Sequence, residues 1–413
     1  MLKLSLLVLS LGLYRVGCCV AIKFPIIIVP DIGGSQIEIR HTRDHQPSPV
    51  FCPSMRNWTQ AWLRSTLSSH MFAHCFARDM SLVFDANTRT YNDQDGVQVR
   101  VPYFGSTESI EYLDDGSSPV TRDTTNYYHA IVQYFVDNAG YVRDESLVAA
   151  PYDWRKSPWS MDGYFEKLQA LVENITAKYR APAIVISHGM GAPVLKAFLL
   201  TMHSDWRDKY IKVWFSVQGV WLGLPKALQA IVSGLNLITQ EHEADLADME
   251  RTMESALFLM PMLGLWPERA AKQLVIVDKA RKSYGVRDYV EMMKALNMTN
   301  AASRLDSVMT RRQEMHGAPG VRLYCMYGTG IDTTWAYNYE TLDGSAPTQE
   351  ILGDGDGIVP LPSMQFCQDW VGKQSQPLVV KKLPKVEHTE AIQNKDVFQY
   401  IHAEIDALAE EHA

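Results

Sequence analysis

The chain has 413 residues, of which 46% are hydrophobic, 21% charged and 10% aromatic. This balance supplies a large apolar core and excludes disordered, collagen-like and coiled-coil proteins. The 39 Lys and Arg residues against 47 Asp and Glu residues leave a net charge of −8. A nucleic-acid-binding protein normally carries a basic face, and no run of Lys and Arg occurs here, so we expect no nucleic-acid partner.

Residues 1–21 have the pattern of a secretory signal peptide. Lys3 gives a positive start, a mainly apolar stretch follows at 4–13, and small residues surround positions 17–21. The apolar stretch is shorter than the about 20 residues that span a bilayer. We therefore predict a cleaved leader rather than a membrane anchor. The remaining chain, residues 22–413, is expected to be secreted or lysosomal.

Four cysteines lie well beyond this leader: Cys52, Cys75, Cys325 and Cys367. In an oxidising compartment we expect them to form disulfides, and four cysteines allow three connectivities. Pairing Cys52 with Cys75 and Cys325 with Cys367 closes the shorter loops. The sequence contains no CxxC pair of the kind that holds structural zinc, so we predict no metal site and no cofactor.

Three Asn-x-Thr triplets are candidate N-glycosylation sites. They begin at Asn57, Asn174 and Asn297. Acceptor asparagines belong on exposed loops of secreted proteins, so the triplets agree with the predicted leader.

Short apolar segments alternate with helical patterns along the chain. The predicted strands are 25–30, 183–188, 212–217, 321–327 and 378–383. The predicted helices are 128–139, 164–177, 192–202 and 397–408. This alternation indicates an α/β fold with a mostly parallel sheet covered on both faces.

Two stretches interrupt the alternation and are predicted to form a cap over the strand ends. Residues 50–80 contain an apolar cluster that includes Trp58, Trp62 and Leu63. Residues 224–300 form a long insertion that we expect to be mainly helical. Ordinary core packing is the alternative explanation for the aromatic cluster.

The strand at 183–188 runs directly into a sharp turn and a helix, as in the nucleophile elbow of hydrolases. The five positions are Ser187, His188, Gly189, Met190 and Gly191. The flanking residues are small, but the apex, Gly189, has no side chain with which to attack a carbonyl. We expect Ser187 to be buried one pleat below the turn, and His188 to be a packed residue rather than a catalytic base.

A carboxylate and a histidine follow later strands in the order found in α/β-hydrolases. Asp356 lies in a glycine-rich loop at 353–360, and His388 lies in the block 386–390. The Asp-Gly-Asp-Gly run at 354–357 also suggests calcium. A full EF-hand loop would end in Glu, and the chain has Gln365 at that position, so calcium is discounted.

The chain resembles the lecithin:cholesterol acyltransferase and lysosomal phospholipase A2 family from about residue 24 to about residue 400. The resemblance rests on IVPDIGGSQIE at 28–38 and on GYVRDESLVAAPYDWR at 140–155. Tyr327-Gly328-Thr329-Gly330, Gly355-Asp356-Gly357 and Glu387-His388 extend it. The two local cysteine pairs also match the pattern of this family.

The resemblance implies an α/β-hydrolase core with a membrane-binding subdomain near 50–80 and a helical cap near 224–300. It also implies transfer of a fatty acyl group from a phospholipid, through a serine acyl-enzyme, to water or an alcohol. The implied partners are a phospholipid membrane or lipoprotein surface and a fatty acyl chain. Trp58, Trp62 and Leu63 are the membrane-binding candidates.

The same resemblance assigns Asp356 as the catalytic acid and His388 as the base, with no serine at the nucleophile position, Gly189. The backbone amides of Ile32 and Met190 are the expected oxyanion hole, which stabilises the charge of a tetrahedral intermediate.

Several residues depart from the family pattern near this centre. Gly189 stands in place of serine, and Asp31 stands in place of the glycine that usually follows Val-Pro. Asp31 adds a negative charge near the oxyanion hole and should weaken it. The segment 220–223 reads Val-Trp-Leu-Gly instead of Pro-Trp-Gly-Gly, and Leu257 stands where the cap usually has tryptophan.

Three hypotheses remain: a working acyl hydrolase or transferase with an unusual nucleophile, a silent relative that binds lipid or a protein partner, and a hydrolase in which His388 activates water. We favour a protein with lost or greatly reduced activity that still binds phospholipid or an acyl chain. We also expect Gly189→Ser to place a hydroxyl within reach of His388 and to restore hydrolysis.

Overall fold

The computed structural model describes residues 24–42, 52–63, 73–114, 125–237, 243–262 and 272–411. The predicted signal peptide, residues 1–21, lies outside the described residues.

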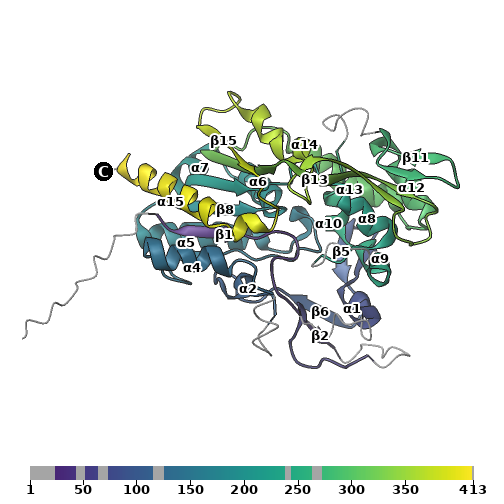
Figure 1. Cartoon of the computed structure of the whole chain (residues 1–413). Coiled ribbons are helices and arrows are strands. Elements are labelled where there is room, and N and C mark those ends of the chain that lie inside the picture. The colour runs from purple at the N-terminus through teal and green to yellow at the C-terminus, as the bar shows by residue number, and fades with distance from the viewer. Residues whose placement is uncertain are drawn as a thin grey trace, which may run out of the picture.

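Six parallel strands form the central sheet of the molecule (Figure 1). In spatial order they are β15 (Leu378–Pro384), β12 (Leu323–Thr329), β9 (Ile211–Val217), β8 (Ala183–His188), β1 (Ile26–Val29) and β7 (Leu147–Ala149). Each neighbouring pair is parallel. The apolar runs predicted as strands suit this sheet because a parallel strand is buried on both faces.

Helices cover both faces of this sheet. Two of them, α4 (His129–Ala139) and α15 (Lys395–Glu410), pack on one face together with Ile26 and Ile28 of β1. On the other face lie α5 (Tyr164–Tyr179) and α6 (Gly191–Thr201), with Ile27 and Val29. Successive residues of β1 therefore enter opposite cores, as the twofold period of a strand requires. This confirms the predicted α/β class.

The region after β1 forms a small subdomain of antiparallel strands and short helices, and its apolar residues share the core of the central sheet. Its elements are β2 (Ile37–His41), β3 (Thr59–Trp62), α1 (Ala73–Met80), β4 (Leu82–Asp85), β5 (Thr90–Asp93), β6 (Val97–Arg100) and α2 (Glu108–Glu111). The strands pair antiparallel, in the orders β3-β2-β6 and β4-β5. In Figure 1 this subdomain lies on one side of the central sheet, around α1, β2 and β6.

A second group of elements follows β9 and lies away from α15 in Figure 1. It contains α8 (Lys226–Ser233), α9 (Ala247–Glu250), α10 (Glu254–Phe258), β10 (Val275–Val277), β11 (Lys282–Tyr284), α12 (Tyr289–Ala295), α13 (Ala301–Glu314), β13 (Ile331–Tyr339), β14 (Gln349–Gly355) and α14 (Leu361–Met364), whereas helix α7 (Ser204–Tyr210) leads directly into β9. The insertion at 224–300 is thus not purely helical, because β10 and β11 join β13 and β14 in a four-stranded sheet.

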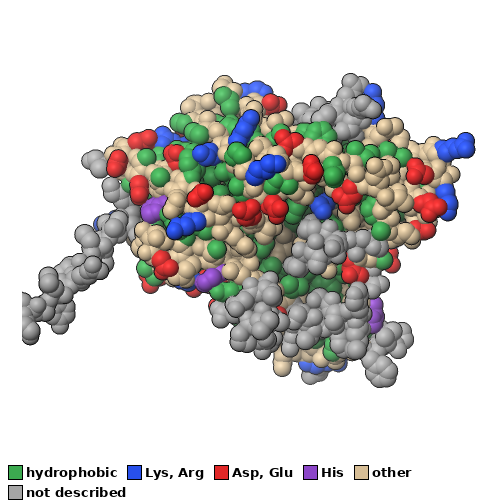
Figure 2. Space-filling model, in the orientation of Figure 1, with side chains coloured by type: hydrophobic (Ala, Val, Ile, Leu, Met, Phe, Trp, Pro, Cys, Tyr) green, Lys and Arg blue, Asp and Glu red, His purple; other side chains and the backbone are tan. Residues whose placement is uncertain are grey.

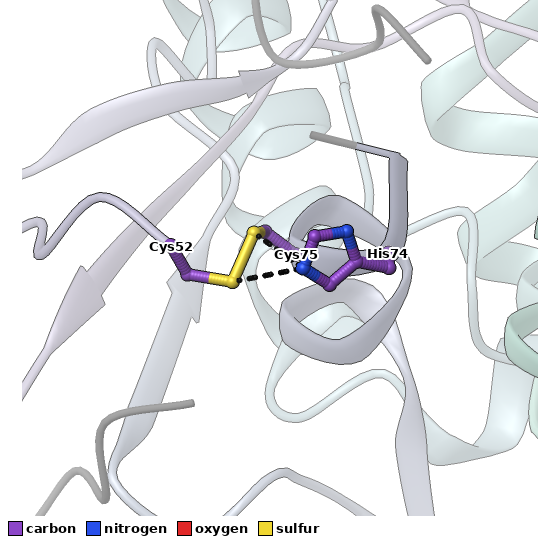
Figure 3. Close-up of side chains that lie close together, drawn as sticks. All are labelled: Cys52, His74 and Cys75. Atoms are coloured by element: carbon purple, nitrogen blue, oxygen red, sulfur yellow. Dashed lines mark hydrogen bonds between the residues drawn. A yellow bond between two sulfur atoms is a disulfide. The ribbon is translucent and has the colours of Figure 1, made fainter. Parts of the chain in front are cut away.

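Both predicted disulfides are present, Cys52–Cys75 and Cys325–Cys367. The first joins the chain before β3 to helix α1, and Figure 3 shows the His74 imidazole beside both of its sulfur atoms. The second joins β12 of the central sheet to the turn that follows α14. Each disulfide therefore fixes an insertion or a loop to an element near the strand ends.

The surface carries charges of both signs. On the face shown in Figure 2, acidic and basic side chains are interspersed rather than gathered into one patch. The candidate acceptors Asn57, Asn174 and Asn297 are all exposed, although Asn174 lies within α5 rather than in a loop. Among the described residues, no helix is long and apolar enough to cross a bilayer.

Candidate active site

The turn between β8 and α6 has the backbone shape of a nucleophile elbow. Gly189 has a φ of +49°, a left-handed conformation that favours glycine. Gly191 must also be small, because a Cβ there would lie 2.3 Å from the backbone oxygen of Pro30. The elbow is therefore built tightly against the end of β1, with an apex that carries no side chain.

Asp356 and His388 form the hydrogen-bonded pair predicted from the sequence. The Nδ1 atom of His388 donates to Oδ2 of Asp356 at 2.7 Å. The other carboxylate oxygen, Oδ1, accepts from the amides of Ile358 at 3.0 Å and Val359 at 2.6 Å. Both side chains are buried. Because the carboxylate is fixed by two amides, it fixes the tautomer and the orientation of the imidazole.

The carboxylate of Asp31 occupies the centre of the site. Its Oδ2 atom lies 3.0 Å from Nε2 of His388, on the opposite side of the ring from Asp356. Its Oδ1 atom accepts hydrogen bonds from the amide of Ile32 at 2.7 Å and from the amide of Met190 at 2.5 Å. These are the two amides predicted to form the oxyanion hole. In this protein they bind an anion supplied by the chain itself.

Asp31 also occupies the space next to the elbow apex. A Cβ atom added to Gly189 would lie 2.1 Å from Cγ of Asp31 and 2.2 Å from each of its carboxylate oxygens. Such distances are far below van der Waals contact. The present position of Asp31 is therefore incompatible with any side chain at residue 189.

The pKa values in this cluster are set by opposing effects. Burial alone would raise the pKa of Asp31, but the hydrogen bond and charge of His388 outweigh it and lower that pKa. Burial alone would lower the pKa of His388, but the charges of Asp356 and Asp31 and their hydrogen bonds raise it to about 10. The geometry thus stabilises an imidazolium between two carboxylates at neutral pH.

His188 lies beside this ion pair and has a different environment. Its Nε2 atom donates to the backbone oxygen of His388 at 3.0 Å. Its Nδ1 atom is buried without a hydrogen-bond partner and lies 3.9 Å from Oδ2 of Asp31. Burial, followed by the charge of His388, lowers the pKa of His188 to about 4, so this imidazole is neutral. His188 is packed, as predicted, but it leaves one lone pair unused.

A cavity of about 280 Å³ opens directly onto this cluster. Asp31 and His388 lie in its wall, and most of the remaining wall is apolar. The apolar lining includes Trp62, Leu113, Leu224, Ala227, Ala230, Leu235, Met253, Ala256, Leu259 and Ile358. Two ionisable side chains, Lys226 and Glu250, also line it. An apolar cavity that ends at a few polar groups is the common form of a small-molecule site.

The aromatic residues predicted for membrane contact have separate positions. Trp62 and Leu63 are buried, and Trp62 donates from its indole to the backbone oxygen of Gly33 at 2.6 Å. Trp58 is partly exposed, with the guanidinium groups of Arg40 and Arg100 over its ring. Trp62 is therefore a wall of the cavity, and the membrane contact of these residues stays a prediction.

Two further sequence interpretations can be placed. Ser187 is fully buried, and its hydroxyl accepts a hydrogen bond from the Trp214 indole at 2.8 Å, away from the elbow apex. Leu257 of the cap is also fully buried, within α10. The sequence did not reveal that Asp31 binds the oxyanion amides. It showed only that Asp31 replaces the glycine that usually follows Val-Pro in the family.

These elements define the class of the protein: a parallel sheet, a tight elbow after one strand, and an acid and a histidine after two later strands form an α/β-hydrolase fold. The solved structure of the Tle4-Tli4 complex has a similar chain, with a TM-score of 0.54 and 13% sequence identity. The alignment covers 94% of this chain and 98% of that one.

The chain belongs to the lecithin:cholesterol acyltransferase family, whose model matches residues 58–315 and 303–405. It is 30% identical over 384 residues to the lysosomal phospholipase A and acyltransferase of Rattus norvegicus, covering 91% of this chain and 89% of that protein. It is also 30% identical over 381 residues to the phosphatidylcholine-sterol acyltransferase of Mus musculus, covering 92% and 84%.

Proposed function

We propose that this protein binds the acyl chains of phospholipids in its apolar cavity and lacks the serine-dependent acyl transfer that its family resemblance implies. The position of the Asp31 carboxylate carries this proposal. Family membership supports a lipid acyl group as the ligand, since the relatives are phospholipases and acyltransferases by name.

The oxyanion hole is occupied by the chain itself. Acyl transfer develops a negative charge on the carbonyl oxygen, and free amide donors must stabilise it. Here the amides of Ile32 and Met190 already bind Oδ1 of Asp31. A substrate carbonyl cannot reach these donors while the carboxylate stays, and a second anion beside it would be repelled. The site therefore lacks its main source of transition-state stabilisation.

The histidine at the base position is held in its protonated form. A catalytic histidine must be neutral to take a proton from a nucleophile. In this protein His388 lies between Asp356 and Asp31, and its pKa is raised to about 10 by their charges against the effect of burial. At the pH of lysosomes or plasma the imidazole is protonated and has no free lone pair. The site therefore lacks a general base for acyl transfer as well as a serine nucleophile.

The apolar wall of the cavity favours binding of an acyl chain. Burial of apolar surface contributes about 25 cal/mol per Å², so an acyl chain gains affinity from an apolar wall without any catalytic group. The wall formed by α8, α10 and Trp62 persists although the nucleophile is absent. We expect the polar end of the lipid near His388 and the acyl chain along α8.

The proposed setting is the secretory pathway, either outside the cell or in lysosomes. Two disulfides support it, because disulfides persist in oxidising compartments. The relatives include a protein named as lysosomal, which agrees with this setting. Phospholipid membranes or lipoprotein particles are accordingly the proposed partners.

The test measures binding and hydrolysis on the same preparation. We expect the purified protein to bind a fluorescent fatty-acid or phosphatidylcholine analogue and to release no fatty acid from phosphatidylcholine liposomes between about pH 4.5 and 7.5. Ala230→Phe, on the cavity wall, should reduce analogue affinity at least about tenfold by filling the cavity. The matched control is Ala403→Phe on α15, where the alanine is exposed and outside the cavity wall.

Two results would overturn the proposal. Rapid stoichiometric labelling of the native protein by a fluorophosphonate probe would reveal an active nucleophile. Equal analogue affinity in the Ala230→Phe and Ala403→Phe variants would place lipid binding outside this cavity.

A further inference from the structure

We propose that Asp31, His188 and His388 form a binding site for a divalent transition-metal cation of the zinc class. Each of the three residues offers one ligand atom within 4.8 Å of the other two, and all three side chains are buried. Two imidazole nitrogens and one carboxylate oxygen are a common ligand set for zinc and for non-haem iron.

The unpartnered nitrogen of His188 is the first observation that points to a ligand. A backbone carbonyl only accepts hydrogen bonds, so Nε2 of His188 carries the proton that it donates to the oxygen of His388. Nδ1 of this imidazole then exposes a lone pair. No group of the described residues donates to it, although it is completely buried. A buried polar atom without a partner is costly, and a metal ion would satisfy it.

The hydrogen bonds around the three ligands match those of established metal sites. A metal-bound histidine typically donates its second N–H to a carboxylate or a backbone carbonyl. His388 donates to Asp356 in this way, and His188 donates to the oxygen of His388. The ligating carboxylate is fixed as well, because Oδ1 of Asp31 accepts from the amides of Ile32 and Met190. Each ligand is therefore oriented by a second partner, and a metal ion would replace the proton that Nε2 of His388 shares with Oδ2 of Asp31.

The distances between ligand atoms are close to what a metal requires. Metal–ligand distances of about 2.0–2.2 Å place neighbouring tetrahedral ligands about 3.3–3.5 Å apart. The Asp31 oxygen lies 3.0 Å from the His388 nitrogen and 3.9 Å from the His188 nitrogen, so the two distances bracket this value. Because Asp31 and His388 line the cavity, the fourth coordination position opens toward it.

The charges of the cluster favour the same conclusion. The carboxylates of Asp31 and Asp356 both contact the His388 imidazole. In the described part of the chain, the ion pairs of these two carboxylates involve only His188 and His388. A single imidazolium balances one of the two negative charges. A divalent cation bound in its place by neutral histidines balances both.

The other metal-ligand cluster among the described residues is Cys52, His74 and Cys75. Its two sulfur atoms are joined in a disulfide, so they carry no thiolate to bind a cation (Figure 3). His74 is exposed there and offers a matched control.

The test uses the purified protein, treated with a chelator and dialysed. We expect isothermal titration with Zn²⁺ to show one equivalent bound, and Co²⁺ to produce visible absorption bands of a tetrahedral or five-coordinate site. Asp31→Gly and His188→Gln should each weaken Zn²⁺ binding by about tenfold or more, because each removes a ligand. His74→Gln should leave the affinity unchanged.

Circular dichroism and thermal melting establish which variants are folded. If His188→Gln does not fold, Asp31→Gly decides the test, since glycine is the residue expected from the family resemblance at that position. Absence of Zn²⁺ binding, or an affinity that is unchanged in folded Asp31→Gly, would overturn the proposal. Ala230→Phe fills only the cavity and should retain Zn²⁺ binding, so a failure of lipid binding is distinguishable from a failure of the metal site.

Discussion

The Asp31 carboxylate lies where a side chain on Gly189 would have to be, with Cγ only 2.1 Å from the position of a Cβ. The two departures from the family pattern are therefore one structural unit. Glycine at 189 gives Asp31 room to reach the amides of Ile32 and Met190, and Asp31 in that position excludes serine at 189. Each substitution makes the other compatible with a packed site.

This relationship revises the expectation that Gly189→Ser alone restores hydrolysis. The new side chain must first displace a buried carboxylate that is held by two amides and His388. We predict that Gly189→Ser stays inert and less stable, while Asp31→Gly/Gly189→Ser reacts with a fluorophosphonate probe. The double variant should also release fatty acid from phosphatidylcholine vesicles above the level of either single variant.

Asp31→Gly is the control for this comparison, because it frees the oxyanion hole without adding a nucleophile. The interpretation fails if Gly189→Ser is labelled as quickly as the double variant. Labelling of neither variant, in proteins that melt cooperatively, would show that the altered segment 220–223 or the cap blocks the site instead.

Much of the fold was predictable because its signals are local. The strands β1, β8 and β9 are short apolar runs bounded by turn residues, and the predicted ends differ by a residue or two from the observed ones. The cysteine pairing also followed from short loops. In contrast, β10 and β11 are three residues each. They pair with each other, and only β10 contacts β13, which is far along the chain and connects both to the larger sheet. No local pattern could reveal them.

The candidate site was predictable residue by residue but not as a geometry. The sequence identified Gly189, Asp356 and His388, and it marked Asp31 as an added charge. It did not show that the Asp31 carboxylate reaches His388, because the two residues are 357 positions apart. Nor could it show the free nitrogen of His188, which depends on a hydrogen bond to a distant backbone oxygen. Such long-range contacts are determined by packing rather than by spacing.

Trp62 and Trp58 provide a matched pair of aromatic substitutions. Trp62 is buried, packs edge-to-face on Trp154 at 5.0 Å between ring centroids, and hydrogen-bonds Gly33. We predict that Trp62→Ala lowers the free energy of unfolding by about 3–5 kcal/mol, as for other buried tryptophans. Trp58→Ala should cost about 1 kcal/mol or less, because its ring is partly exposed.

Urea denaturation followed by circular dichroism measures both values. Vesicle flotation of Trp58→Ala, which should remain folded, then tests the predicted membrane contact without a change in stability. A stability loss at Trp58 equal to that at Trp62 would contradict the assignment of Trp62 as the packed residue.

The disulfide between Cys325 and Cys367 should contribute strongly to stability. It closes a loop with a sequence separation of 42 and ties β12 to the turn after α14. Chain-entropy estimates give about 4 kcal/mol for such a loop. We predict that Cys325→Ala/Cys367→Ala lowers the urea midpoint more than Cys52→Ala/Cys75→Ala, whose loop has a separation of 23. The reverse order would show that native contacts, rather than loop closure, determine how much stability each disulfide contributes.

Lys196 of α6 is buried against Trp370, with its Nζ atom 3.6 Å from the ring centroid. Burial lowers the pKa of this amine well below its ordinary value. At neutral pH the unfolded chain therefore binds the proton more tightly than the folded chain, and stability rises with pH between the folded and unfolded pKa values. Replacing a buried ion pair by apolar side chains often stabilises by about 1–4 kcal/mol, and we expect a gain of the same sign for this single buried amine. We predict that Lys196→Met is more stable than the parent at pH 7 and that the difference shrinks at pH 9.

Lys381→Met is the matched control, because Lys381 also lies over an aromatic ring, that of Tyr400, but is partly exposed. Urea unfolding at both pH values measures the effect, and a Lys196→Met variant less stable than the parent at pH 7 would contradict it.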